Sequence, residues 1–262
     1  MGVTFRMFRR SIAIAAVCAS GLALTAQQST GGPDAVAQAD IQKQLHGKQF
    51  RNVQVQVGDG VATLTGSVDR LADKLDAEKR VVKTHETSSV NDQITVQVAE
   101  KISDAALFQK LGRGLAYDRQ GYASFPFNSM TVEVQNGVVT LGGEVVEPED
   151  KASAIGLITN TAGVRGLVDH LLVAPVSPND WQLRRALLQA VYGASQLQKY
   201  AIDPVRPIRI VVLNGHATLT GAVLNAGDRD IAGLRANGVP GVFSVTNDIQ
   251  VQGQGQGKER VD

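Results

Sequence analysis

Four histidines are the residues of this sequence best suited to hold a metal ion or to exchange a proton near neutral pH. They are His46, His85, His170 and His216, and they are far apart along the chain. A metal site needs ligands that converge, typically with a paired spacing along one element. No such pair occurs among them, so we expect solvated surface histidines and neither a metal site nor a cofactor.

Nucleophilic chemistry finds no support either. Cys18 is the only cysteine, and it lies inside an apolar run near the start of the chain. The remainder therefore has no thiol nucleophile and no disulfide. No Gly-x-Ser-x-Gly sequence occurs, which excludes the nucleophile elbow of the α/β-hydrolases. The sequence predicts a protein that is not an enzyme.

Three polar residues recur at equivalent places in similar segments. Asp92, Asp169 and Asn247 each stand near the start of a short apolar segment. One hypothesis is a polar binding site present three times. The other, which we favour, is a side chain that accepts a hydrogen bond from the nearby backbone at a strand entrance.

These residues belong to an internal repeat. The segments VQVQVGDGVATLTGSV (53–68), MTVEVQNGVVTLGGEV (130–145) and IRIVVLNGHATLTGAV (208–223) align with offsets of 77 and 78 residues. The same offsets relate 90–96, 167–173 and 245–251. The repeat also aligns six glycines, which are Gly60, Gly66, Gly137, Gly143, Gly215 and Gly221. They suit turns and strand ends, because no helix follows them at the spacing of a phosphate-binding loop.

Each copy predicts the order helix, strand, strand, helix, strand. Asp-Gly and Asn-Gly dipeptides favour tight hairpins, and alternating apolar residues give each strand one buried face. First helices are expected at 34–45, 104–117 and 180–192, and second helices at 69–84, 148–161 and 225–237. The fold class is therefore α+β. It comprises three tandem αββαβ modules, each a three-stranded mixed sheet with two helices on one face.

The chain divides into segments around these modules. Residues 1–26 combine Arg6, Arg9 and Arg10 with a short apolar run, which indicates a signal peptide cleaved after Ala26 and a periplasmic or secreted protein. A retained membrane anchor is the alternative. The other segments are a linker at 27–33, module one at 34–99, module two at 104–174, module three at 179–252 and a flexible tail at 253–262.

Charge and exposed apolar residues suggest where a partner could bind. The whole chain carries a net charge of +1, and loss of residues 1–26 leaves −2, which gives no reason to expect a nucleic acid partner. Module three is the basic one, with seven bases and five acids in residues 179–252. We assign possible contacts with an anionic phospholipid or an envelope protein to these residues: Arg184, Arg185, Lys199, Arg206, Arg209, Val211 and Leu213. The alternative is an ordinary solvated charged surface.

Apolar residues on the outer sheet faces predict contact between modules. Some apolar residues alternate with the buried positions of their strands and should therefore point to the outer face. They are Val138, Val168 and Leu172 in module two, and Val211 and Leu213 in module three. Exposed apolar patches usually mark an interface. We expect these faces to pack modules two and three together, with a partner or lipid surface as the alternative.

The repeat resembles the BON domain (bacterial OsmY and nodulation). The resemblance is carried by NGVVTLGGEV with GVRGLVDHLLV, by NGHATLTGAV with GVFSVTNDIQV, and by GVATLTGSV with SSVNDQITV. Module one departs from it, with Glu86-Thr87 where the others have Gly163-Val164 and Gly241-Val242. It is a divergent copy.

The resemblance implies a protein similar to the osmotically inducible periplasmic OsmY-like proteins. It implies a non-enzymatic envelope protein that binds phospholipid or envelope components, with a role in envelope or osmotic stress. The alternative that it also implies is a periplasmic chaperone or scaffold for exported proteins. No transmembrane segment is expected after cleavage.

Overall fold

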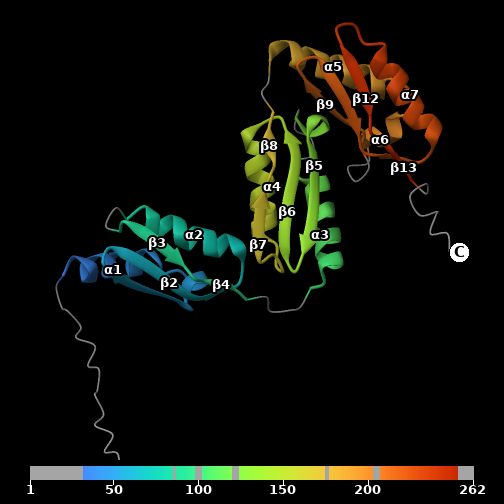
Figure 1. The fold of residues 1–262 in the computed structure, drawn as a ribbon. Coiled ribbons are helices and arrows are strands. Elements are labelled where there is room, and N and C mark those ends of the chain that lie inside the picture. The colour runs from blue at the N-terminus through green and yellow to red at the C-terminus, as the bar shows by residue number, and fades with distance from the viewer. Residues whose placement is uncertain are drawn as a thin grey trace, which may run out of the picture.

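The computed structural model describes residues 32–84, 87–97, 102–119, 124–174, 177–202 and 207–252. Three small α/β modules follow one another along the chain (Figure 1). The predicted signal peptide with Cys18, the tail, His85 and Arg206 lie outside the described residues.

Modules one and two share one order of elements. Module one comprises α1 (Pro33–Gln44), η1 (Lys48–Phe50), β1 (Val53–Gly58), β2 (Val61–Val68), α2 (Leu71–Val82), β3 (Ser89–Asp92) and β4 (Thr95–Val96). Module two comprises α3 (Asp104–Tyr117), η2 (Phe125–Phe127), β5 (Ser129–Gln135), β6 (Val138–Val145), α4 (Pro148–Asn160), β7 (Gly166–Asp169) and β8 (Leu172–Val173). The central strand pairs with an antiparallel hairpin partner and with a parallel closing strand.

Module three repeats this order with an added short helix. Its elements are α5 (Pro178–Tyr192), α6 (Gln198–Ile202), β9 (Arg209–Leu213), β10 (His216–Thr220), β11 (Ala222–Val223), α7 (Ala226–Asn237), β12 (Ser244–Asn247) and β13 (Gln250–Val251). β10 pairs with β9 antiparallel and with β12 parallel, and β11 pairs with β13. The helices cover one face of each sheet (Figure 1). The predicted α+β class is confirmed.

The closing strand is broken in every module. It divides into β3 and β4, β7 and β8, or β12 and β13, where a single strand was expected. At the break, Asp92 accepts the N–H of Ile94 at 2.8 Å and Asp169 that of Leu171 at 2.9 Å, while Asn247 accepts the N–H of Ile249 at 3.4 Å. The recurring polar residues therefore bind local backbone, as we favoured.

An acid at the start of each first helix holds the hairpin turn. Both oxygens of Asp34 accept backbone N–H groups from Asp59 and Gly60. Asp104 binds Asn136 and Gly137 in the same way, and Asp180 binds Asn214 and Gly215. The side chain joins two elements that local sequence does not connect, and sequence reasoning assigned no such role to these acids.

The second glycine of each hairpin lies where no side chain fits. Gly66, Gly143 and Gly221 have φ of +106°, +98° and +116°. A Cβ atom at these positions would lie 1.9, 2.1 and 2.2 Å from the backbone oxygens of Asn52, Ser129 and Pro207. These glycines are therefore required by the close approach of the two strands.

The junction between modules one and two is formed by their second helices. α2 contacts α4, and Leu71 of α2 is buried in the core cluster of module two. Arg70 donates to Asn160 at 3.4 Å.

The junction between modules two and three uses the turn η2. Phe127 is 4% exposed and belongs to the core cluster of module three, where its ring meets Trp181 edge to face at 5.5 Å. The expected packing through the outer sheet faces is wrong, because Val138, Val168 and Leu172 are exposed. Two aromatic rings on η2, outside any strand, fill the interface.

Candidate functional site

Arg184, a predicted phospholipid contact, is buried. Its side chain is 1% exposed, and its Nη2 donates to the carbonyl of Val212 at 2.7 Å. Burial lowers its pKa, an effect partly offset by Asp180 and Glu144. Its predicted contact with a lipid surface is therefore wrong. The position lies three residues from both Trp181 and Leu187, on the apolar stripe of α5.

Arg209, another predicted contact, is used within the protein. Its guanidinium lies 4.1 Å from the ring centre of Phe125 and donates to the carbonyl of the same residue. Burial lowers the pKa of Arg209 to about 10, and Tyr192 partly offsets this effect. Arg209 therefore holds module three to η2.

Lys199 is paired inside module three. Its Nζ lies 2.7 Å from Oδ2 of Asp228, an oxygen that also accepts hydrogen bonds from the Tyr200 hydroxyl and from Asn225. Of the remaining predicted contacts, Arg185 and Leu213 are exposed and Val211 is partly buried. The predicted cations of module three that the structure describes therefore do not form one surface.

The contacts of Asp228 with Lys199 and Tyr200 should make the stability of the fold depend on pH. Burial raises the pKa of Asp228, but hydrogen bonds from Lys199 and Tyr200 outweigh it, so the folded-state pKa lies below the usual value of 3.8. The lowered pKa stabilises the fold above about pH 4, and this stabilisation is lost as the pH falls through the folded-state value.

We expect Asp228→Asn to be about 1–2 kcal/mol less stable than the wild type at pH 7. The difference should shrink below pH 4, as measured by urea unfolding from pH 7 to pH 3. A constant difference over that range would contradict the assignment. Asp230→Asn, on the exposed side of α7, is the matched control.

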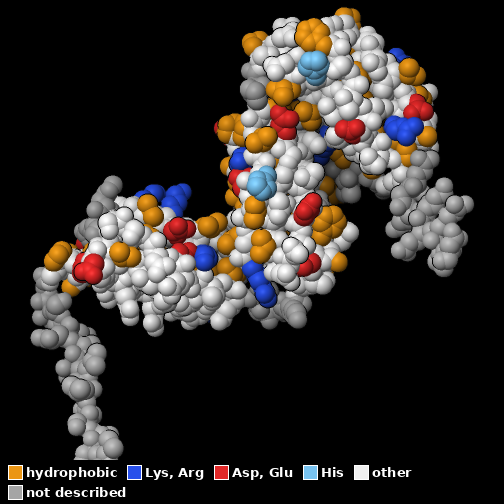
Figure 2. Space-filling view, in the orientation of Figure 1, with side chains coloured by type: hydrophobic (Ala, Val, Ile, Leu, Met, Phe, Trp, Pro, Cys, Tyr) orange, Lys and Arg blue, Asp and Glu red, His pale blue; other side chains and the backbone are white. Residues whose placement is uncertain are grey.

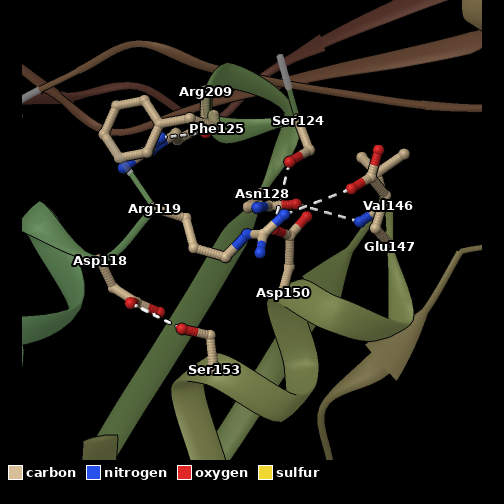
Figure 3. A network of polar contacts seen from close by, with 10 residues as sticks. All are labelled: Asp118, Arg119, Ser124, Phe125, Asn128, Val146, Glu147, Asp150, Ser153 and Arg209. Carbon is tan, nitrogen blue, oxygen red and sulfur yellow. Dashed lines mark hydrogen bonds and ion pairs between the residues drawn. The ribbon is translucent and has the colours of Figure 1, made fainter. Parts of the chain in front are cut away.

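A polar network stabilises module two beside its junction with module three (Figure 3). Arg119 forms ion pairs with Asp150 and Glu147, and the Ser124 hydroxyl donates to Asp150 at 3.1 Å. The Oδ1 atom of Asn128 accepts the N–H of Val146 at 3.0 Å. These contacts fix η2 in place, and we assign the network a structural role.

The outer face of α3 has the chemistry of a binding surface. Lys110, Arg113 and Tyr117 are exposed along one stripe of the helix, opposite the buried Leu107 and Leu111. They line an open hollow of about 570 Å³ together with Ala106, Gln109 and Gly114. Neither cation forms an ion pair with any residue that the structure describes. Sequence reasoning missed this face, because residues 104–174 as a whole hold five bases and eight acids.

The equivalent helices do not carry this arrangement. In α5 the positions of Lys110, Arg113 and Tyr117 are Ala186, Gln189 and Gly193. In α1 they are Asp40, Lys43 and Gly47, and Lys43 pairs with Asp40 at 2.6 Å. The fold therefore does not require the basic face of α3.

Histidines and carboxylates form no metal site in the described part of the chain. His216 binds Ser244 through Nδ1 at 2.8 Å, and His46 contacts the carbonyl of Lys43. Across the described residues, no helix combines the length and the apolar character needed to cross a bilayer.

Three segments match the family model of the BON domain, at residues 33–98, 103–175 and 194–253. They cover most of the chain, so this protein belongs to the BON domain family. The resemblance inferred from the repeat is thereby confirmed. The family indicates an envelope-type protein and a binding rather than a catalytic domain.

Solved structures that match include two of CdsD, a structural protein of the type III secretion system of Chlamydia trachomatis. One is 19% identical, covers 81% of this chain and 90% of that chain, and has a TM-score of 0.23. The other, of the C-terminal domain, is 20% identical with coverages of 81% and 96% and a TM-score of 0.22. At such TM-scores no functional conclusion follows. No curated protein matches the chain.

Proposed function

We propose that this protein is a non-enzymatic envelope protein that binds anionic phospholipid surfaces through the outer face of α3. The observation that carries the proposal is the stripe of Lys110, Arg113 and Tyr117, in which two cations that pair with no described carboxylate stand beside an exposed aromatic ring. Cations attract anionic headgroups, and tyrosine favours the membrane–water interface.

A double substitution tests this surface. Each base near a membrane surface contributes about 1 kcal/mol to anionic lipid binding, so Lys110→Gln with Arg113→Gln should weaken binding roughly thirtyfold. The assay is sedimentation with vesicles of phosphatidylglycerol and phosphatidylcholine at low salt, and added salt should weaken wild-type binding.

Lys79→Gln with Lys83→Gln is the matched control, because it removes two exposed cations from module one. It should bind nearly as the wild type does. Equal losses in both double variants would indicate only a general charge effect, and a wild type that ignores the vesicles would refute the proposal.

One observation favours the second candidate, a chaperone or scaffold for exported proteins. The edge that β7 and β8 form in the module two sheet exposes Val168, Leu172 and Val173, and Val138 of the central strand is exposed as well. An apolar sheet edge can pair with an extended polypeptide. This candidate gains support if the protein suppresses aggregation of an unfolded client in the absence of lipid and Leu172→Gln removes that effect.

A further inference from the structure

Three Asn-Gly dipeptides occur in the sequence, and each is a candidate for spontaneous covalent change. They are Asn136-Gly137, Asn214-Gly215 and Asn237-Gly238. In such a dipeptide the glycine nitrogen can attack the carbonyl carbon of the asparagine side chain, because glycine has no side chain to hinder the approach. Ammonia leaves and a cyclic imide forms. Water then opens the imide to aspartate or to isoaspartate, whose backbone is longer by a methylene group.

The structure holds the glycine N–H of both hairpin dipeptides on a carboxylate. Gly137 donates to Oδ1 of Asp104 at 2.9 Å, and Gly215 donates to Oδ1 of Asp180 at 2.8 Å. Both glycines are buried. The attacking nitrogen must lose its proton, and a negative charge in direct contact disfavours that loss. Each acid therefore opposes the first step of the reaction.

The same carboxylates also fix the backbone of the two asparagines. The N–H of Asn136 donates to Oδ2 of Asp104 at 2.6 Å, and that of Asn214 donates to Oδ2 of Asp180 at 3.0 Å. Both asparagines have a positive φ, of +53° and +50°. A left-handed residue must rotate about its Cα–C bond before the imide ring can close. Two hydrogen bonds to one carboxylate resist this rotation.

The third dipeptide is held in another way. The N–H of Gly238 donates to the carbonyl of Leu234 at 3.2 Å, at the end of α7. The side-chain nitrogen of Asn237 donates to the carbonyl of Gly233 at 2.9 Å. Only in the hairpins, therefore, does the glycine N–H depend on a side chain that a substitution can remove.

Module one indicates which reaction product would disturb the fold. It has Asp59-Gly60 at the turn, and Oδ1 of Asp34 accepts the N–H of Gly60 at 3.2 Å. An aspartate is therefore compatible with this turn. Isoaspartate would instead lengthen a tight turn that sets the register of the two strands.

The surrounding surface supplies no comparable charge. Figure 2 shows acidic and basic side chains interspersed over the visible face of the molecule. Exposed charges of this kind are screened by salt, whereas a carboxylate in direct contact with the N–H is screened much less. The local acid should therefore dominate the reactivity of each hairpin.

We propose that Asn136 and Asn214 are deamidation sites whose reaction is suppressed by Asp104 and Asp180. The inference goes beyond the proposed function and does not depend on lipid binding. Besides joining the first helix to the hairpin, each acid preserves the covalent structure of the turn. Deamidation begins when the first helix separates from the hairpin, so the modified fraction records how often this contact opens.

Asp104→Ala tests the inference in the whole chain. During incubation at mildly alkaline pH, peptide mapping by mass spectrometry follows aspartate and isoaspartate at Asn136. The rate there should rise about tenfold or more, because a hydrogen bond to a charged group contributes on this scale. Asn214 keeps its acid and should react at the wild-type rate. Asp180 is less suitable for substitution, because it also stabilises the charge of the buried Arg184.

Glu149→Ala is the matched control. It removes an exposed acid from the first turn of α4 in the same module and should leave the rate at Asn136 unchanged. Asp104→Asn retains the size of the side chain without its charge, and it replaces the alanine variant if that variant does not fold. An unchanged rate at Asn136 in a folded variant of Asp104 overturns the inference.

Unfolding is separated from loss of the contact by two further measurements. The wild type in guanidinium gives the rate at Asn136 in the unfolded chain, and urea unfolding gives the unfolded fraction of the Asp104 variant. Their product is the rate that unfolding alone would cause. A rate well above this product supports the inference. A rate equal to it in a folded variant overturns the inference, because the fold as a whole would then protect Asn136.

Discussion

Gly143→Ala is expected to destabilise module two by about 3 kcal/mol or more. The residue has a φ of +98°, and the new methyl group would lie 2.1 Å from the carbonyl oxygen of Ser129. That oxygen belongs to the backbone of the paired strand, so the clash can be relieved only by separating β5 from β6. Urea unfolding of the whole chain, followed by circular dichroism, measures the loss.

Gly156→Ala is the control for this prediction. Gly156 lies within α4, and a Cβ there would meet nothing within 4 Å. Because this partly buried helix position has room for a methyl group, alanine should be neutral or stabilise by up to about 1 kcal/mol. Similar unfolding curves for the two variants would show that the strand ends separate more easily than the structure indicates.

Phe127→Ala is expected to uncouple module three from module two. The side chain is 4% exposed in the core cluster of module three, although it belongs to the chain of module two. Removing a buried phenylalanine costs about 3–5 kcal/mol. The contact of Arg209 with Phe125 on the same turn should also weaken. Modules two and three should then unfold as separate transitions in calorimetry.

Two readouts make this prediction specific. Trp181 meets Phe127 at 5.5 Å, so its fluorescence should shift to the red in the variant. Phe108→Ala removes the same side chain from an exposed position on α3 and should leave both the fluorescence and the calorimetric profile nearly unchanged. A Phe127→Ala profile identical to that of the wild type would show that η2 does not couple the modules.

Local patterns in the sequence were sufficient to predict the helices and hairpins within each module. The stretch 104–117 was predicted as a helix and is α3. Dipeptides such as Asn136-Gly137 adopt positive φ at both positions, as a tight hairpin requires. These features depend on neighbouring residues, so periodicity and turn chemistry reveal them.

Features that depend on contacts between residues far apart in the sequence were not predicted. Arg184 carries a charge, which suggested exposure, yet its place between Trp181 and Leu187 on the apolar stripe of α5 buries it. Phe127 and Arg209 looked like ordinary residues of separate modules, and only the docking of η2 brings them together. The face of α3 was obscured by averaging the charge over the whole module.

The order of strands within each module has a consequence for folding during synthesis. The central strand β6 lies between β5 and the closing strands β7 and β8, and the closing strands come last in the sequence. A chain that emerges from its N-terminus therefore leaves one edge of each central strand open until the end of that module appears. We expect the modules to fold one after another. The side chain of Phe127 will lack the core of module three, against which it packs, until that module has emerged.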